Sequence, residues 1–155
     1  MSAIRKQKIT PCLWFNFNAE EAVAHYTSIF KGSKVTRTLH YGDENPELKG
    51  KVLLMEFELA GQQFQALNVG PQFPFTNAIS LSVDCDDQAE VDRMWARLCE
   101  GGSEGNCSWL TDKFGLCWQI VPERIGEILK HPKAMAAMMT MVKFDIAALE
   151  AAAKE

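Results

Sequence analysis

Alternating and helical hydrophobic patterns occur twice along the chain, in the same order. A strand-like run over Ile9–Phe15 is followed by Asn18, a good helix N-cap, and then by an apolar helical stripe that ends at Phe30. A second strand-like run over Ala78–Val83 is followed by Asp87 and by another apolar helical stripe. Each cap has a glutamate close behind it, as in a capping box, and each stripe ends at glycine.

The two patterns coincide when one is shifted along the other. Val83 lies 68 positions after Phe15, and the apolar positions of the two stripes match at the same offset. This period is too long for a solenoid and occurs only twice, so it indicates a duplicated module. We therefore predict helices over Ala19–Phe30 and Gln88–Cys99, both on the outer side of their sheets.

Strand-like segments follow each predicted helix. In the first module they are Lys34–Tyr41, Val52–Leu59 and Gln63–Asn68. In the second module they are Glu104–Leu110, with an interruption expected at Gly105, and Leu116–Val121. The chain is thus expected to be a single α+β domain over residues 1–155, with two βαβββ modules at about 8–69 and 77–122. Residues 70–76, which include two prolines, are the expected linker, and residues 123–155 the expected helical tail.

The tail carries apolar stripes of its own. One stripe is rich in methionine, and Asp145 is placed to cap a last helix. No third layer is evident from the sequence for these stripes to pack against, and a short isolated helix is marginal in water. We therefore expect a homodimer with the tail helices at or near its interface.

Composition and charge narrow the function classes. The 155 residues are 47% hydrophobic and 23% charged, with a formal net charge of −4 and no dense basic block, which excludes a typical nucleic-acid binder. No secretory h-region follows the N-terminal charges, and the uncharged stretch Leu59–Val83 holds too many amides, prolines and glycines to span a membrane. Five cysteines without a C-x-x-C pair indicate reduced thiols in a cytoplasmic protein.

Five sequence runs together resemble a known family. They are ITPCLWF, EEAVAHYTSIF, FQALNVGPQFPF, ISLSVDCDDQAEVDRMW and TDKFGLCWQIVP. They are similar to the PhnB-like branch of the glyoxalase/bleomycin resistance/extradiol dioxygenase (vicinal oxygen chelate) superfamily, often labelled 3-demethylubiquinone-9 3-methyltransferase. The resemblance implies two modules that curl mixed or antiparallel sheets around a cavity, with helices outside, in a homodimer. A ubiquinone methyltransferase activity is not expected, because the sequence lacks the G-x-G turn that a nucleotide-binding fold needs.

The resemblance also implies where a metal would bind. Metal-dependent members of the superfamily hold the ion with His or Glu on four strands. The matching positions here are Thr10, Ala66 or Asn68, Ala78 or Ser80, and Gln119. None of these is a histidine or an acid, and the three histidines lie elsewhere, at His25, His40 and His131. We therefore expect a protein without metal or other cofactor.

Strand alternation predicts the side chains that line the cavity. Ile79, Leu81 and Val83 would lie beneath the helix, whereas Phe64 and Ala66 would face the cavity together with Asn68. The predicted ligand-binding residues are Thr10, Cys12, Trp14, Asn68, Ser80, Ser82, Cys117 and Gln119, with Glu56 either facing the cavity or solvated. One indole, a thiol, amides and hydroxyls suit a flat or apolar small molecule held by a few polar contacts.

A reaction is harder to derive from the residues. Glu56, His40, Tyr41 and Cys117 are candidates for acid–base chemistry, but nothing in the sequence joins them in a relay, so the catalytic residues stay unknown. The favoured hypothesis is a metal-free small-molecule-binding protein of the antibiotic-resistance type. A metal-independent lyase or isomerase that acts in the same cavity is the alternative, and a partner-binding protein is a third.

Overall fold

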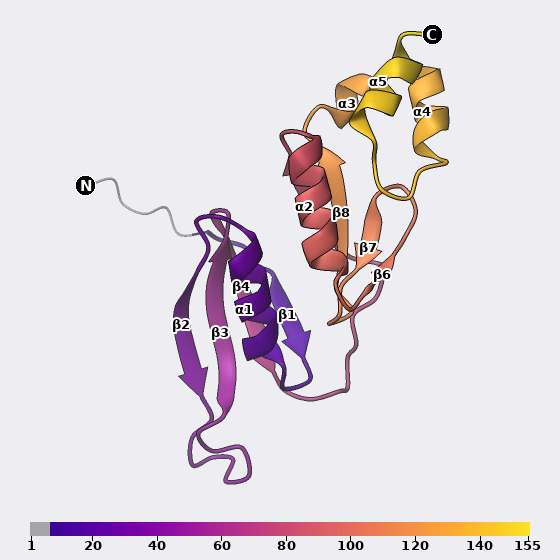
Figure 1. Ribbon diagram of the computed structural model, residues 1–155. Helices are drawn as coiled ribbons and strands as arrows, with labels where there is room; N and C mark the ends of the chain where they lie inside the picture. Colours follow the sequence, from indigo (N-terminus) through magenta and orange to yellow (C-terminus); the bar gives the residue numbers. More distant parts are fainter. Residues whose placement is uncertain (1–6) are drawn as a thin grey trace, which may run out of the picture. The chain divides into compact units, whose positions relative to one another are not determined.

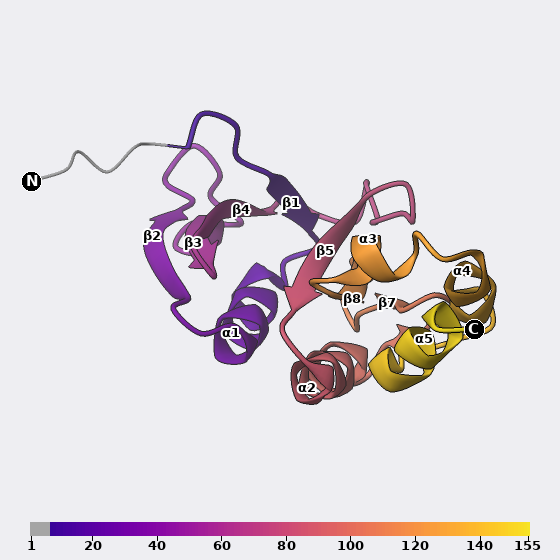
Figure 2. The ribbon, with the colours of Figure 1, turned by 90° about the horizontal axis from the view of Figure 1, so that it is seen from above.

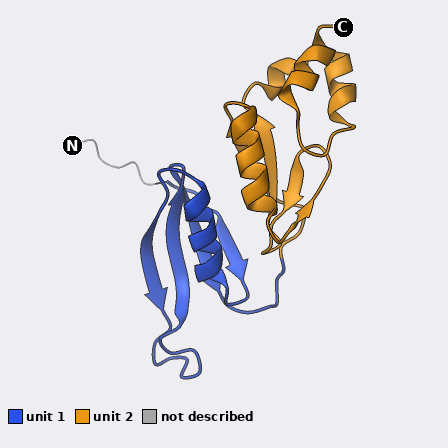
Figure 3. Ribbon diagram, viewed as in Figure 1, with its two compact units in different colours: residues 1–74 blue, residues 75–155 orange. Residues whose placement is uncertain are grey.

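The chain divides into two compact units. The computed structural model describes residues 7–155, and the boundary lies between Pro74 and Phe75 (Figure 3), within the stretch expected as a linker. We call the unit before the boundary module 1 and the unit after it module 2, which includes the tail. No helix within residues 7–155 is long and apolar enough to cross a membrane.

Module 1 is one four-stranded sheet with a helix on one face (Figure 1). Its elements are β1 (Cys12–Phe15), α1 (Ala19–Ile29), β2 (Lys34–His40), β3 (Val52–Leu59) and β4 (Gln62–Asn68). The strand order is β1-β4-β3-β2, with β1 parallel to β4 and the other pairs antiparallel. Helix α1 packs on β3 and β4, so its apolar stripe meets the apolar positions of those strands. The βαβββ order predicted for this module is confirmed.

The core of module 1 lies between α1 and the sheet. Val23 and Tyr26 of the helix are fully buried, and Phe57 and Ala66 of the sheet are buried opposite them. Phe57 stacks on Phe64 with ring centroids 5.5 Å apart. Burying an aromatic or large aliphatic side chain is worth about 1.5–3 kcal/mol, so these contacts keep the helix on one face of the sheet.

Strand β1 is shorter than the predicted run Ile9–Phe15. It begins after Pro11, because proline has no N–H to give to a β-ladder, and Ile9 is 83% exposed. The side-chain amide of Gln7 takes over the pairing, since its Nε2 donates to the Gln63 carbonyl at 3.0 Å and its Oε1 accepts from the Gln63 N–H at 3.1 Å.

Module 2 repeats the plan of module 1. Its elements are β5 (Ser80–Cys85), α2 (Gln88–Cys99), β6 (Ser103–Glu104), β7 (Trp109–Thr111) and β8 (Cys117–Pro122). The sheet order is β5-β8-β7-β6, with β5 parallel to β8. The predicted helix over Gln88–Cys99 is confirmed, and the apolar side chains of β8 beneath it are buried as expected. Ile79 was placed wrongly, because the strand begins only at Ser80 and Ile79 is 61% exposed.

The hairpin of β6 and β7 is interrupted after Glu104, as the glycine at position 105 predicted. Cys107 and Ser108 in the connection have left-handed backbone conformations, with φ of 55° and 63°. Their N–H groups donate to the carbonyls of Met141 and Val142, at 2.8 and 2.7 Å. The tail therefore supplies the partners that a longer hairpin would have supplied.

The tail folds as three short helices that pack against one another. They are α3 (Ile125–Ile128), α4 (Pro132–Met138) and α5 (Ile146–Ala153), with α4 and α5 side by side (Figures 1 and 2). Ile128, Ala134, Phe144 and Leu149 form their buried core. The expectation that the tail has nothing of its own to pack against is wrong, because stripes on three helices only meet in the fold. The cap predicted at Asp145 is confirmed, since its side chain accepts from the Ala148 N–H at 2.9 Å.

Candidate functional site

One face of each sheet is left uncovered by its helix, and these two faces carry most of the candidate site residues. In module 1 the covered face holds Leu13 and Phe15 of β1 and Phe64 and Ala66 of β4, all of them buried. The side chains between them point to the opposite face because strand residues alternate. We call that opposite side the open face of module 1.

A polar row crosses the open face of module 1 from strand to strand. Cys12 of β1 pairs in register with Gln65 of β4, Gln65 with Glu56 of β3, and Glu56 with Arg37 of β2. The Arg37 guanidinium forms a two-pronged bond to Glu56, with Nε to Oε2 at 2.9 Å and Nη2 to Oε1 at 3.1 Å. Glu56 thus lies on the open face, partly exposed, and its charge is neutralised there by Arg37.

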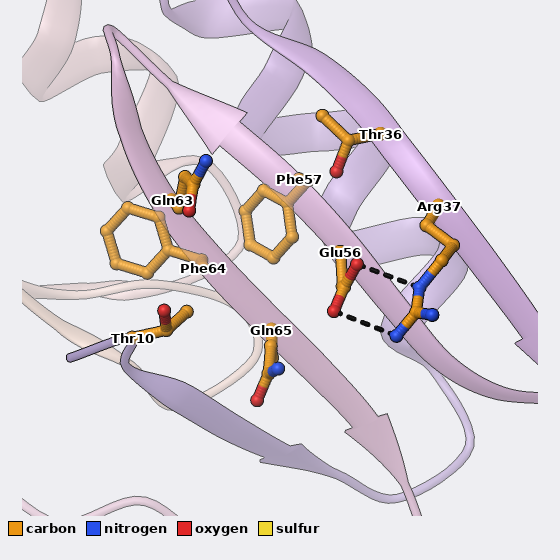
Figure 4. Close-up of a pocket in the computed structure, with 8 residues that line it drawn as sticks. All are labelled: Thr10, Thr36, Arg37, Glu56, Phe57, Gln63, Phe64 and Gln65. Carbon is orange, nitrogen blue, oxygen red and sulfur yellow. Dashed lines mark hydrogen bonds and ion pairs between the residues drawn. The ribbon is translucent and has the colours of Figure 1, made fainter. Parts of the chain in front are cut away.

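A hollow lies over this polar row (Figure 4). Its volume is about 380 Å³, and its lining comes from module 1 alone. Thr10, Thr36, Arg37, Glu56, Phe57, Gln63, Phe64 and Gln65 line it. Of the predicted site residues, the hollow brings together Thr10 and Glu56, while Cys12 lies next to Gln65 in the sheet.

A second, apolar row runs beside the polar one. Trp14 of β1, Leu67 of β4, Leu54 of β3 and Leu39 of β2 pair in register across all four strands. The indole N–H of Trp14 donates to the Gly70 carbonyl at 2.8 Å, and Phe73 meets its ring edge-on with centroids 4.9 Å apart. The predicted site residue Trp14 therefore lies on the open face with its polar atom already bonded.

Asn68 lies on the covered face, so the prediction that it faces the cavity is wrong, as is that for Ala66, whereas Phe64, although buried, contributes to the lining of the hollow. Asn68 is 2% exposed, its Oδ1 accepts from the Ala19 N–H at 3.0 Å, and its Nδ2 donates to the Val52 carbonyl at 3.1 Å. A one-residue error in strand parity reverses every side chain. A polar residue at position 68 favoured placing this set of side chains on the face without the helix. In the structure, Asn68 instead caps α1.

The open face of module 2 holds the other predicted residues. Ser80 and Ser82 of β5 pair in register with Cys117 and Gln119 of β8. The Gln119 amide donates to the Ser80 hydroxyl at 2.9 Å. Ser82 is exposed, whereas Cys117 is only 2% exposed. The Cys117 thiol donates to the side-chain Oδ1 of Asn77 at 3.0 Å.

Gln65, Arg37 and Trp109 are among the open-face residues that escaped the sequence reasoning. Gln65 was assigned to the wrong face with the rest of β4, although the alternation of polar Gln63 and Gln65 with apolar neighbours carries the correct parity. Arg37 sits at a register irregularity in β2, which breaks the simple alternation. Trp109, which pairs with Gln119, belongs to a strand of only three residues, too short to show a period.

Burial makes three of the five thiols poor nucleophiles. Partial burial raises the pKa of the Cys12 thiol above its ordinary value. Burial, together with the nearby Glu90 and Asp84 carboxylates, raises the pKa of Cys85 to about 12, and burial with Glu104 raises the pKa of Cys99 to about 11. A thiol must ionise to attack, so these three stay protonated near neutral pH.

The residues at the strand positions expected to hold a metal do not fit one. The open-face residues there are Thr10, Gln65, Ser80 and Gln119, which offer hydroxyl and amide oxygens. Among residues 7–155, no three His, Cys, Asp or Glu side chains gather in a way that could hold a metal ion. Transition metals prefer imidazole, carboxylate or thiolate. Glu56, the carboxylate in the hollow, is bonded to Arg37.

Comparison with known proteins shows the family. The chain belongs to the family described as 3-demethylubiquinone-9 3-methyltransferase, whose sequence model matches residues 7–121. Its structure resembles a putative 3-demethylubiquinone-9 3-methyltransferase, PhnB protein, from Bacillus cereus, with 35% identity and a TM-score of 0.68 over 75% of this chain and 99% of that one. No curated protein matches.

Two further solved structures support the fold. The Pseudomonas aeruginosa protein PA1353 is 27% identical with a TM-score of 0.64, over 76% of this chain and 98% of that one. The fosfomycin resistance protein FosX of Listeria monocytogenes has a TM-score of 0.55 at 18% identity, over 83% of this chain and 100% of that one. The fold is therefore that of the vicinal oxygen chelate superfamily.

The methyltransferase in the family's description finds no support in the fold. A nucleotide-binding methyltransferase fold needs a mostly parallel sheet, with a glycine-rich turn between a strand and its helix. Each sheet in residues 7–155 has one parallel pair and is otherwise antiparallel. The turn between β1 and α1 has the sequence Asn16-Phe17-Asn18, without glycine.

Proposed function

We propose that this protein binds an organic small molecule without the help of a metal ion, on the open face of module 1. The observation that carries the proposal is the polar row of module 1. There Gln65 and Thr10 present uncharged hydrogen-bonding groups beside a hollow of about 380 Å³, and Arg37 occupies the Glu56 carboxylate. The size and concave shape suit a small ligand.

Binding without turnover is favoured by what three of the four acid–base candidates do in the fold, while the fourth, His40, is exposed and does not line the hollow. Glu56 is bonded to Arg37, the Tyr41 hydroxyl donates to the Asn68 carbonyl, and the Cys117 thiol contacts Asn77. A general acid or base has to exchange its proton with substrate, and these three groups are engaged by the protein instead.

The test is a thermal-shift screen of the full chain against metabolites and aromatic antibiotics, with a chelator and with added Mn²⁺ or Zn²⁺. We expect at least one compound to raise the Tm equally with and without metal, and the chelator alone to leave the Tm unchanged. Gln65→Leu should reduce the ligand-induced rise, whereas Gln62→Leu, an exposed position on the same strand, should not. A rise that needs metal, or a product seen by mass spectrometry, would contradict metal-free binding.

We further propose that the chain acts as one domain and as a homodimer in the cytoplasm. Support for the dimer comes from the exposed apolar side chains of the tail, with Met139 65% and Val142 42% exposed. The five free cysteines support a reducing compartment. Met139→Asp should weaken association in light scattering without unfolding the tail, because Met138, not Met139, packs against its core. A monomeric wild-type protein would refute the dimer.

A further inference from the structure

The charges on the open face of module 1 are arranged in opposite pairs. Beside the bonded pair of Arg37 and Glu56, Lys34 of β2 lies 3.9 Å from Glu58 of β3. The two carboxylates and the two cations cancel, so the face offers no net charge to a ligand. An anion at Arg37 would have to displace a carboxylate that already makes both bonds of a two-pronged pair, the strongest geometry available to arginine.

Uncharged hydrogen-bonding groups surround that pair. Thr10, Thr36, Gln63 and Gln65 line the hollow, and none of their side chains bonds to another described residue. Two amides and two hydroxyls provide both donors and acceptors. A ligand with hydroxyl or amide groups can bond to both the donors and the acceptors. An anion would bond only to the donors, and a cation only to the acceptors.

The apolar row supplies the other half of the surface. Leu67 of β4 and Leu54 of β3 are each two residues along the strand from the polar row, on the same face. Leu39 of β2, at the end of the apolar row, is 39% exposed. Because the Trp14 N–H is bonded to Gly70, its ring offers apolar surface and no free donor. Hydrogen-bonding and apolar surface thus lie side by side on one sheet face.

From this arrangement we infer that module 1 takes an uncharged amphipathic molecule, with hydroxyl or amide groups over Gln65 and an aromatic or flat apolar part over the row of Trp14. The inference rests on the proposed function and names its ligand class. It also assigns a role to the pair of Arg37 and Glu56, which is to keep the hollow neutral so that anions are rejected.

Three matched probes test the ligand class on the full-length protein by NMR titration. Phenyl β-D-glucoside has both parts and no charge, phenyl β-D-glucuronide adds a carboxylate, and methyl β-D-glucoside lacks the aromatic ring. We expect phenyl glucoside to bind about tenfold more tightly than either of the others, with shifts at Gln65 and Trp14. Preference for the glucuronide, or no binding of phenyl glucoside, would overturn the ligand class.

Variants separate this inference from the proposed function. Glu56→Gln frees the Arg37 cation, so the glucuronide should bind this variant several-fold more tightly than it binds the wild type. Glu58→Gln, two residues along β3 from Glu56, is the matched control and should increase the affinity for the glucuronide less. If another compound from the thermal-shift screen binds but maps away from Gln65, the ligand class fails and the proposed function stands. If nothing in the screen binds, the proposed function fails.

Discussion

The two modules repeat one order of elements but begin their helices in different ways. In module 2, the Asp87 side chain accepts from the Glu90 N–H at 2.9 Å, so the cap predicted there is confirmed. The Glu90 side chain accepts at 2.7 Å from the N–H of Asp86, one residue before the position that a capping box uses. In module 1, Asn18 is the N-cap residue, as predicted, but its side chain makes no cap bond. Asn68, on the last strand of that module, accepts from the first N–H of the helix instead.

This difference shows that two modules with the same sequence pattern can cap their helices with different hydrogen bonds. Helix α2 is capped by its own neighbours, so its start depends on local sequence. Helix α1 is capped from β4, so its start depends on the sheet being formed. Each module also buries a polar side chain that makes several hydrogen bonds: Asn68 in module 1, and in module 2 Asp112, whose carboxylate accepts from the Trp118 indole and from two backbone N–H groups.

The largest effect we predict concerns the tail, which module 1 lacks. Phe144 is 2% exposed in the core of the tail helices, and Phe144→Ala should lower the free energy of unfolding by about 3 kcal/mol, because a large cavity replaces the ring. Urea unfolding measures the loss. Met139→Ala, at an exposed position of the same segment, should cost less than about 0.5 kcal/mol. Equal losses would mean that the tail adds no packed core to module 2.

Removing the distant cap of α1 should have the next largest effect. Asn68→Ala leaves the Ala19 N–H and the Val52 carbonyl buried without their partners, which should cost about 2–3 kcal/mol of unfolding free energy. Asn18→Ala should be nearly neutral in the same urea titration. A larger loss for Asn18→Ala than for Asn68→Ala would show that the helix is capped locally after all.

The local cap of α2 should matter less. Asp87→Ala should cost about 1 kcal/mol, the usual value for a helix N-cap, and Asp87→Asn should restore most of it because the amide oxygen can still accept. Thermal unfolding of both variants checks this. If Asp87→Ala destabilises as much as Asn68→Ala, the local and distant caps do not differ in the way described.

The smallest effect is a pH dependence that arises at Asp92 of module 2. Hydrogen bonds from Lys143 and Gln88 hold the pKa of the Asp92 carboxyl below its ordinary value of 3.8. A lowered folded-state pKa adds stability above 3.8 that is lost as the pH falls through the lower value. Lys143→Met should therefore flatten the acid limb of a stability–pH curve measured by urea unfolding. Lys133→Met, which removes a different exposed ion pair, should leave that limb unchanged.

Much of the fold follows from the sequence, because long apolar stripes and strand alternation report directly on burial. The stripe of α2 predicted its bounds, and the duplicated pattern predicted two βαβββ modules. Short elements carry too few residues for a period, so β6, β7 and the packing of the tail required the structure. Bonds between distant segments, such as that from Ala19 to Asn68, leave no local trace in the sequence.

The candidate site was predictable only where strand parity was clear. On β8 the buried Trp118 and Ile120 mark the covered face, so Gln119 could be placed correctly on the open one. Strand β4 ends at Asn68, a polar residue on the covered face, and this residue favoured assigning the wrong face to the strand's side chains. The pairing of Arg37 with Glu56 depends on the irregular register of β2 and β3, which no periodic pattern contains.

The two left-handed residues between β6 and β7 have a consequence for how module 2 opens. Cys107 and Ser108 each carry a backbone strain of about 1–3 kcal/mol, and the carbonyls of Met141 and Val142 hold them in place. When the tail undocks, both residues relax, and that relief lowers the cost of undocking. The amides of Cys107 and Ser108 should therefore exchange with deuterium at the same rate as those of α5, as one cooperative unit, while the amides of β8 stay protected until the whole module unfolds.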